Sequence, residues 1–386
     1  MKPTNSTFSA AGTTIFEVTS RLAAAHKAIN LGQGFPDHKG PEDVRAKARE
    51  FLEDEPNQYP PMMGVPVLRQ AVADHDRRFY KLDVDSERGV MVTAGATEAL
   101  ASCLFGLIEP GDEVVVIEPL YDSYLPVIRR AGGIPRIVRL TPPLWELPRD
   151  DLANAFSDKT KLLILNSPMN PNGKVFSADD LSFVAELLTR HDAYAVCDEV
   201  YEHLVFDSKQ HIPLITLPGM AKRCLRIGSA GKTFSLTGWK IGYVVADPAL
   251  LQPVARAHQF ITFTVVPNLQ RAVAFGLGKP EDYFKSLAHD LQQKRDFLSD
   301  KLTTIGFSIL PCNGTYFITA DISPLGFDGN DSAFCEHITT EAGVSAIPVS
   351  AFYESAPPEN FVRFAFCKDI KVLGEAVDRL TRHFRN

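Results

Sequence analysis

Two apolar runs of the chain are joined by the stretch Ser229-Ala230-Gly231-Lys232-Thr233-Phe234-Ser235-Leu236-Thr237-Gly238-Trp239-Lys240-Ile241-Gly242. The run before it spans residues 224–227, the run after it spans 241–246, and both are expected to be buried strands. Lys232 is therefore expected in a Gly/Ser/Thr loop between two strands. Most loop lysines are simply solvated. A buried lysine amine, by contrast, has a lowered pKa and can attack a carbonyl carbon to form a Schiff base.

Short apolar runs alternate with helical segments through the first two thirds of the chain. Further strands are expected at 90–93, 113–117, 134–140, 161–165 and 194–197, and helices at 17–27, 97–108, 123–131 and 177–190. The strands are apolar throughout, as expected where helices cover both faces of a sheet. This order predicts an α/β fold with a mostly parallel sheet.

The pattern changes towards the C-terminus. Residues 248–277 are expected to be helical, and a long amphipathic helix over 282–302 is expected to bridge two domains. Strands at 308–310, 315–318 and 361–366, with helices at 331–342 and 369–384, predict a smaller α+β domain. We expect residues 46–280 to form the large domain, and residues 1–45 and 281–386 to form the small one.

Composition excludes several classes of protein. The chain has 386 residues, a net charge of −7 and 45% hydrophobic residues, which is typical of a globular protein and unfavourable for binding nucleic acid or an anionic membrane. No run of 18 apolar residues predicts a membrane span. The six cysteines are scattered without a Cys-x-x-Cys pair, so neither a disulfide framework nor a metal site is expected. With a polar N-terminus, these features predict a cytoplasmic location.

Polar residues follow several expected strands, and ligands of open α/β sheets bind at the carboxyl ends of strands. Gly95-Ala96-Thr97 forms a strand-to-helix turn, where free N–H groups can bind an anion such as phosphate. Asp198 directly follows an apolar strand, where a carboxylate is costly unless it is paired. It could cap a turn, form a salt bridge, or pair with a protonated ring nitrogen.

The remaining candidates have both structural and functional interpretations. Asn170 lies in a proline-braced loop, and Tyr201 lies three residues after Asp198; an amide and a phenol could converge on one oxygen. Tyr121 could stack on a planar ligand or pack in the core. Arg363 stands among phenylalanines, where it either reaches outward or binds a carboxylate through its two-pronged guanidinium.

Taken together, these motifs resemble the class I and II aminotransferases, pyridoxal 5′-phosphate enzymes of fold type I. The most specific motifs are Asn170-Pro171-x-Gly173, Asp198-Glu199-Val200-Tyr201, and the block from Ser229 through Lys232 to Gly242. Within the family, the chain is most similar to the methionine and kynurenine aminotransferase branch. The resemblance implies a seven-stranded sheet, a homodimer with shared active sites, and amino acid and 2-oxo acid substrates.

The resemblance also implies roles around the cofactor ring. Lys232 would hold the cofactor aldehyde as an imine and later carry the Cα proton. Asp198 would pair with the pyridinium nitrogen, Asn170 and Tyr201 would bond the ring hydroxyl, and Tyr121 would stack on the ring.

The phosphate and substrate sites follow in the same way. The phosphate would be held by Gly95, Ala96, Thr97, Ser229 and Lys240, and by Tyr59 of the neighbouring subunit. Arg363 would bind the substrate carboxylate, with further contacts at Gly34 and Asn170. Phe16, Tyr59 and Tyr121 would form an apolar wall, which favours methionine, aromatic, kynurenine or glutamine-like donors.

Two positions depart from many relatives, because Gly231 stands where serine is common and Lys240 where arginine is common. The branch that the chain resembles shares that lysine. A cysteine-conjugate β-lyase on the same fold would use the same cofactor residues and stays open as an alternative. A pyridoxal-phosphate-sensing regulator would need a basic DNA-binding module, and residues 1–30 are too short and not basic. A nicotinamide dehydrogenase would need a glycine fingerprint that Gly32-x-Gly34 does not complete.

Overall fold

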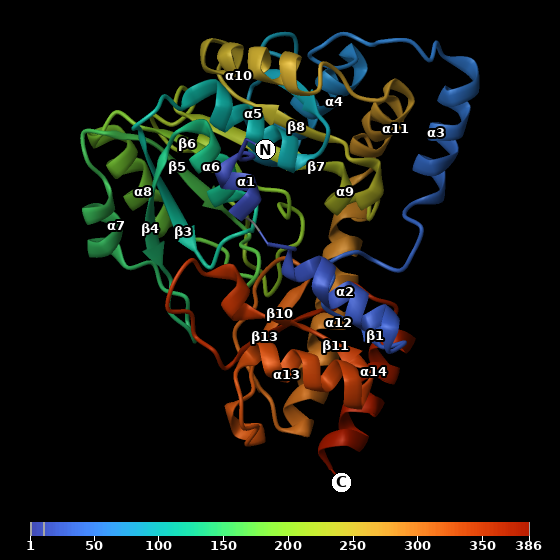
Figure 1. The fold of residues 1–386 in the computed structure, drawn as a ribbon. Coiled ribbons are helices and arrows are strands. Elements are labelled where there is room, and N and C mark those ends of the chain that lie inside the picture. The colour runs from blue at the N-terminus through green and yellow to red at the C-terminus, as the bar shows by residue number, and fades with distance from the viewer. Residues whose placement is uncertain (1, 11, 386) are drawn as a thin grey trace.

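A seven-stranded sheet forms the centre of the larger part of the molecule (Figure 1). The computed structural model describes residues 2–10 and 12–385. The strand order is β2-β8-β7-β6-β5-β3-β4, and all neighbours are parallel except the two pairs that involve β8. The strands are β2 (Val90–Thr93), β3 (Glu113–Glu118), β4 (Ile134–Arg139), β5 (Thr160–Asn166), β6 (Tyr194–Asp198), β7 (Cys224–Ser229) and β8 (Gly242–Val245). The predicted mostly parallel seven-stranded sheet is confirmed.

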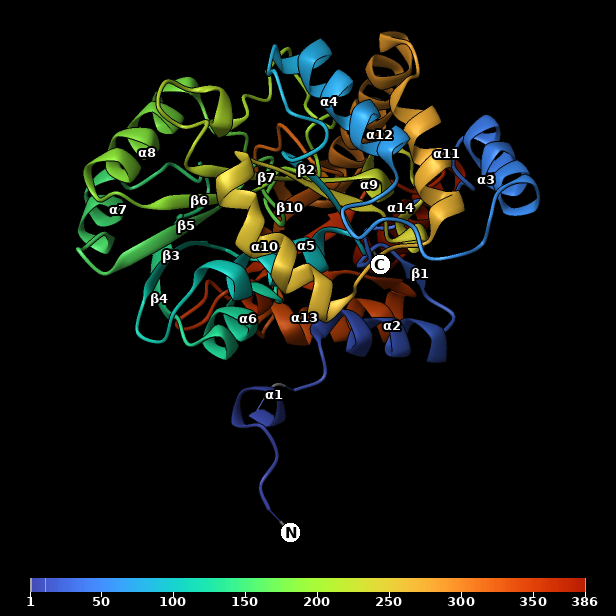
Figure 2. The ribbon, with the colours of Figure 1, turned by 90° about the horizontal axis from the view of Figure 1, so that it is seen from above.

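Helices cover both faces of this sheet, which explains why its strands are apolar throughout (Figure 2). Val114 and Val116 pack with one group of helices, whereas Val115 and Ile117 pack with the other, because successive side chains of a strand point to opposite faces. The first group is α5 (Ala96–Leu107), α6 (Tyr124–Ala131) and α10 (Pro248–Ile261), and the second is α7 (Arg149–Ala155) and α8 (Ala178–Arg190). A third group, α3 (Glu42–Asp54), α4 (Pro66–Tyr80) and α11 (Pro267–Leu277), packs against β2 and β8.

The smaller domain contains a four-stranded antiparallel sheet of order β12-β13-β10-β9. Its strands are β9 (Ser308–Ile309), β10 (Phe317–Asp321), β12 (Ile347–Pro348) and β13 (Phe361–Ala365), and its helices are α12 (Glu281–Ile305), α13 (Asp331–His337) and α14 (Ile370–Phe384). The N-terminal arm carries α1 (Ser6–Ala10) and α2 (Ile15–Ala25), and its strand β1 (Ile29–Asn30) pairs with β11 (Val344–Ser345). Short helical turns complete the fold at Leu214–Thr216, Thr237–Trp239, Ser323–Leu325, Ile338–Ala342 and Val349–Phe352.

Several predicted elements need correction. The helical segment 248–277 is two helices, because Phe263 takes a left-handed backbone conformation and Pro267 starts α11. The strand expected at 315–318 is β10, which begins two residues later because Thr315 has a φ of +67°. Helices α1, α3, α4 and α7 were not predicted.

The proposed division at 45/46 falls inside α3, whereas the division at 280/281 coincides with the start of α12. Both divisions stay predictions. Within the described residues, no helix is long and apolar enough to cross a membrane.

Candidate active site

A pocket of about 360 Å³ lies where β5, β6 and β7 end, between the large sheet and the smaller domain. Its wall combines the strand-end residues of the large sheet with Phe317 and Arg363 from β10 and β13. Apart from Tyr59, all the predicted site residues line it: Phe16, Gly34, Gly95, Ala96, Thr97, Tyr121, Asn170, Asp198, Tyr201, Ser229, Lys232, Lys240 and Arg363.

Lys232 lies in a short helix, α9 (Ala230–Thr233), that follows β7 directly. This corrects the prediction of a loop. Its Nζ donates a hydrogen bond to the Tyr316 hydroxyl at 2.9 Å. Burial lowers the pKa of Lys232 to about 8. About a tenth of this amine is therefore the nucleophilic free base at pH 7, far more than for an ordinary lysine.

Asp198 ends β6 and points into the pocket with one carboxylate oxygen unused. Oδ2 accepts a hydrogen bond from the Tyr124 hydroxyl at 2.6 Å, whereas Oδ1 is buried and has no hydrogen-bond partner among the described residues. Burial raises the pKa of Asp198, and the Tyr124 hydrogen bond opposes that shift. A buried acceptor left free in this way fits a cationic ring N–H.

The N-terminus of α5 forms another part of the pocket wall. Gly95, with a φ of +81°, precedes the helix, and no side-chain hydrogen bond caps the first turn. A Cβ at Gly95 would lie 3.3 Å from Lys240 Nζ, so the lysine head group lies close to this turn. The N–H groups of this first helical turn, beside a lysine and Ser229, are suited to a phosphate.

Arg363 is only 1% exposed, yet one of its N–H donors is left over for a ligand among the described residues. Its Nη1 donates to Asn170 Oδ1 at 2.9 Å and its Nη2 donates to the Gly32 carbonyl at 2.7 Å, while Nε has no partner among the described residues. Burial lowers the pKa of Arg363 to about 10. The guanidinium lies 3.8 Å from the Phe317 ring centroid and 5.4 Å from that of Phe16, so aromatic rings enclose it.

Sequence reasoning missed two residues that contact this machinery. Tyr124 holds Asp198, and Tyr316 holds Lys232. Tyr124 lies in the first turn of α6, only three residues after Tyr121, so its position offered a signal. Tyr316 lay within an expected strand and offered none.

Tyr59 lies apart from the other predicted site residues. Its side chain is 85% exposed, and its ring packs edge-on against Phe263 with centroids 5.5 Å apart. A role for Tyr59 in this chain's own pocket is therefore not supported, whereas its predicted role in a neighbouring subunit stays a prediction.

The fold and the pocket together define a class: an α/β enzyme that presents a lysine amine, a buried carboxylate and an anion-binding helix N-terminus to one ligand. The model of the family "Aminotransferase class I and II" matches residues 26–380. The chain belongs to the class I and II aminotransferase family.

Relatives across the family match nearly the whole chain. The chain is 42% identical over 380 residues to a probable N-succinyldiaminopimelate aminotransferase, DapC, of Mycobacterium tuberculosis, with 96% of each protein covered. It is 38% identical to the methionine aminotransferase of Escherichia coli, covering 96% of this chain and 95% of that protein. It is also 38% identical to a kynurenine–oxoglutarate transaminase of Dictyostelium discoideum, covering 99% and 96%.

Solved structures agree with this grouping. The N-succinyldiaminopimelate aminotransferase of Mycobacterium tuberculosis superimposes with a TM-score of 0.96 at 42% identity, covering 98% of this chain and 100% of that one. YbdL of Escherichia coli, described as having a methionine aminotransferase function, also has a TM-score of 0.96, at 37% identity and with 99% and 100% covered. The cofactor of this family is pyridoxal 5′-phosphate, and the free Asp198 oxygen and the uncapped α5 terminus fit its two ends.

Proposed function

We propose that this aminotransferase transfers the amino group of methionine, an aromatic amino acid, kynurenine or a glutamine-like donor to a 2-oxo acid by a ping-pong mechanism. The observation that carries the choice of donor is the charge of the pocket wall. Among its described lining residues, the cations are Lys232, Lys240 and Arg363. If the first two serve the cofactor and the third binds the α-carboxylate, no cation of the wall is left for a charged substrate side chain.

The cofactor would be held at both ends of the pocket. Lys232 would attach its aldehyde, Asp198 would pair with its ring nitrogen, and Tyr201 and Asn170 would bond its ring hydroxyl. Gly95, Ala96, Thr97, Ser229 and Lys240 would hold its phosphate, and Tyr121 would lie against its ring. When bound, pyridoxal phosphate supplies an electron sink that stabilises negative charge at the substrate Cα.

Lys232 would have a second role as proton carrier. Its amine has a pKa of about 8 because it is buried, so it can accept a proton at neutral pH and release it again. The same nitrogen would therefore first attach the cofactor and then move the proton.

Arg363 would fix the substrate through its carboxylate. The Nε atom has no partner among the described residues, and Asn170 holds the guanidinium by its Nη1. Charge-assisted hydrogen bonds of this kind contribute about 1.5–3 kcal/mol each. The side chain of the donor would then lie along Phe16, Tyr121 and Gly34, which favours an apolar or aromatic group.

A homodimer with shared active sites is part of the same proposal. Tyr59 and Phe260 are 85% and 84% exposed, and Phe263 and Val266 are also exposed. Large apolar side chains gathered on one surface favour association with another protein surface. If that second copy sits as the family resemblance implies, Tyr59 would contact the phosphate site of the other subunit. The six free cysteines are all buried, which supports a reducing, cytoplasmic environment.

A panel of amino donors tests the assignment. Purified protein reconstituted with pyridoxal phosphate should convert methionine, phenylalanine, kynurenine or glutamine with a 2-oxo acid acceptor, faster than aspartate or N-succinyldiaminopimelate. Preference for either carboxylated donor would overturn the substrate proposal, and would mean that a cation from outside this wall serves the site. Pyruvate and ammonia released from a cysteine conjugate without an acceptor would favour the β-lyase instead. Lys232→Ala is the control, since it should abolish turnover with every donor.

A further inference from the structure

We propose that Tyr316 is a positioning residue that turns the lone pair of the Lys232 amine towards the substrate. The inference rests on the proposed function, because it assumes that Lys232 carries the proton. It adds a residue that neither the sequence motifs nor the charge of the pocket wall pointed to.

The Tyr316 hydroxyl stands between the amine and the chain segment that contacts Arg363. It accepts a hydrogen bond from Lys232 Nζ at 2.9 Å and donates one to the Gly34 carbonyl at 2.6 Å. Tyr316 itself is 1% exposed, and its ring packs edge-on against Tyr201 with centroids 5.2 Å apart. The hydroxyl therefore has a fixed position, and the Tyr201 hydroxyl is its nearest alternative partner.

The direction of these bonds decides what Tyr316 can do. A phenol has one proton, and here the Gly34 carbonyl receives it, so towards Lys232 the oxygen can only accept. One N–H of the free amine is thus held by Tyr316, and the lone pair points elsewhere. Burial also raises the pKa of Tyr316 well above its ordinary value, so the phenol stays neutral and is no rival base.

The Gly34 carbonyl reaches this hydroxyl because position 34 has no side chain. A Cβ at Gly34 would lie 2.6 Å from the Tyr316 ring and 2.3 Å from the Phe317 ring, closer than real contacts allow. The same segment places the Gly32 carbonyl on Arg363 at 2.7 Å. One stretch of backbone thus connects the residue that would grip the carboxylate with the residue that orients the amine.

The test begins with cofactor-free protein, so that it does not depend on turnover. Competitive acetylation of Lys232 with acetic anhydride across pH 6–10 measures the pKa of the amine. Tyr316→Phe removes an acceptor that stabilises the ammonium form, so the pKa of Lys232 should fall by about one unit. Tyr353→Phe is the matched control, because the Tyr353 hydroxyl is buried without a partner among the described residues. That variant should leave the pKa of Lys232 unchanged.

The holoenzyme gives the second readout. In Tyr316→Phe, kcat should fall by roughly 10- to 100-fold while KM changes little, because misplacement of a catalytic group mainly affects the reacting complex. The kinetic isotope effect with an α-deuterated donor should rise, since removal of the Cα proton becomes slower relative to the other steps. A hydroxyl that only fills space would change neither the labelling pKa nor the isotope effect.

An unchanged or raised pKa of Lys232 in Tyr316→Phe, or an unchanged isotope effect, would overturn the inference. Should that variant fold poorly, 3-fluorotyrosine at position 316 keeps the hydroxyl but weakens it as an acceptor, and the pKa of Lys232 should again fall. Failure of the proposed function is recognised separately, because Lys232→Ala would then retain turnover whatever Tyr316 does.

Discussion

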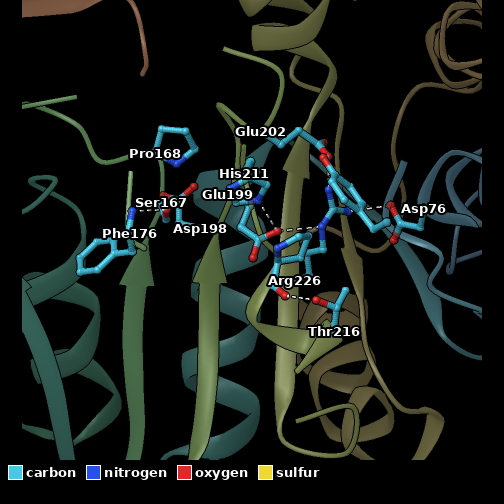
Figure 3. Close-up of polar contacts among 12 residues, drawn as sticks. Asp76, Ser167, Pro168, Phe176, Asp198, Glu199, Glu202, His211, Thr216 and Arg226 are labelled. Carbon is cyan, nitrogen blue, oxygen red and sulfur yellow. Dashed lines mark hydrogen bonds and ion pairs between the residues drawn. The ribbon is translucent and has the colours of Figure 1, made fainter. Parts of the chain in front are cut away.

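Asp198 and Glu199 are neighbours in the chain, but they belong to two different groups of buried charges. Figure 3 shows the group of Glu199, which lies beside Arg226. Asp198 points towards the pocket, whereas Glu199 pairs with Arg226 of β7 at 2.8 Å. This follows from the strand pleat, because Val196 and Cys197 just before them already pack on opposite faces of the sheet. Two consecutive residues therefore contribute to different places: Asp198 to the pocket, and Glu199 to the buried ion pairs around Arg226.

The two groups differ in how their charges are paired. Arg226 is fully buried and forms ion pairs with Asp76, Glu199 and Glu202, and Tyr243 also donates a hydrogen bond to Glu202. In the pocket, no ion pair joins Lys232, Asp198 or Arg363 to another charged side chain of the described residues. Charges that pair with each other hold the fold, and charges left unpaired are available to a ligand.

The largest effect on stability is expected from Arg226→Met. This change would leave three buried carboxylates without their shared cation, and breaking a buried pair in this way costs about 3–5 kcal/mol. Urea unfolding of the cofactor-free protein measures the loss. Arg223→Met is the control, because Arg223 pairs with Asp192, whose side chain is 90% exposed. That surface pair should contribute at most about 1 kcal/mol. Equal stability of the two variants would contradict the structural role of the Arg226 group.

Substitutions at the dipeptide separate the two groups most directly. Asp198→Asn should lower turnover by roughly 10²–10³-fold, since it removes a preorganised charge from the site. The cofactor-free protein should unfold at the same or a higher urea concentration, because burial already disfavours this carboxylate. Glu199→Gln should do the reverse, with lower stability and nearly normal turnover of the folded fraction. If both variants lose the same property, the division between the groups is wrong.

The strands of the sheet could be predicted from the sequence, because a short apolar run such as Val114 to Ile117 is typical of a strand that helices cover on both faces. The sequence also indicated the residues that end those strands, since parallel strands bring their carboxyl ends to one edge. Helix α4 was missed although Pro66 at its first turn and the spacing of Leu68 and Val72 were available signals.

Other features depend on packing that no local pattern encodes. The hydroxyl of Tyr316 meets an amine 84 positions away in the chain, and Arg226 meets Asp76 across 150 positions. The sequence around Arg226 predicted only a strand. Its ion-pair partners could not be predicted, because they come from segments that share no motif with it. Long-range polar contacts of this kind are set by how the elements pack, not by the sequence around either residue.

Arg363→Lys tests an unpaired charge at the substrate end of the pocket. Lysine keeps the charge but loses the two-pronged geometry, so KM for the amino donor should rise by roughly 10- to 100-fold, equivalent to about 1.5–3 kcal/mol. Absorbance of the bound cofactor should be unchanged. An amine that lacks the carboxylate should be used equally poorly by both proteins. Loss of the cofactor in this variant would instead assign Arg363 to the cofactor site.

The last test of this comparison is a pH-dependent difference in stability between cofactor-free wild type and Lys232→Met. Burial lowers the pKa of Lys232 to about 8 in the folded protein, whereas an unfolded lysine has a pKa of about 10.4. Between these values the unfolded state binds a proton that the folded state does not, so the free energy of unfolding of the wild type rises with pH relative to the variant. Below pH 8 both states hold the proton and the difference between the proteins should be constant.

Urea unfolding at pH 7, 8, 9 and 10 measures this difference in the free energy of unfolding. Every other titrating group is common to both proteins, so the contributions of those groups cancel. A difference that stays constant up to pH 10 would mean that Lys232 keeps its ordinary pKa when folded, and the amine would then be as fully charged as the Arg226 guanidinium at neutral pH.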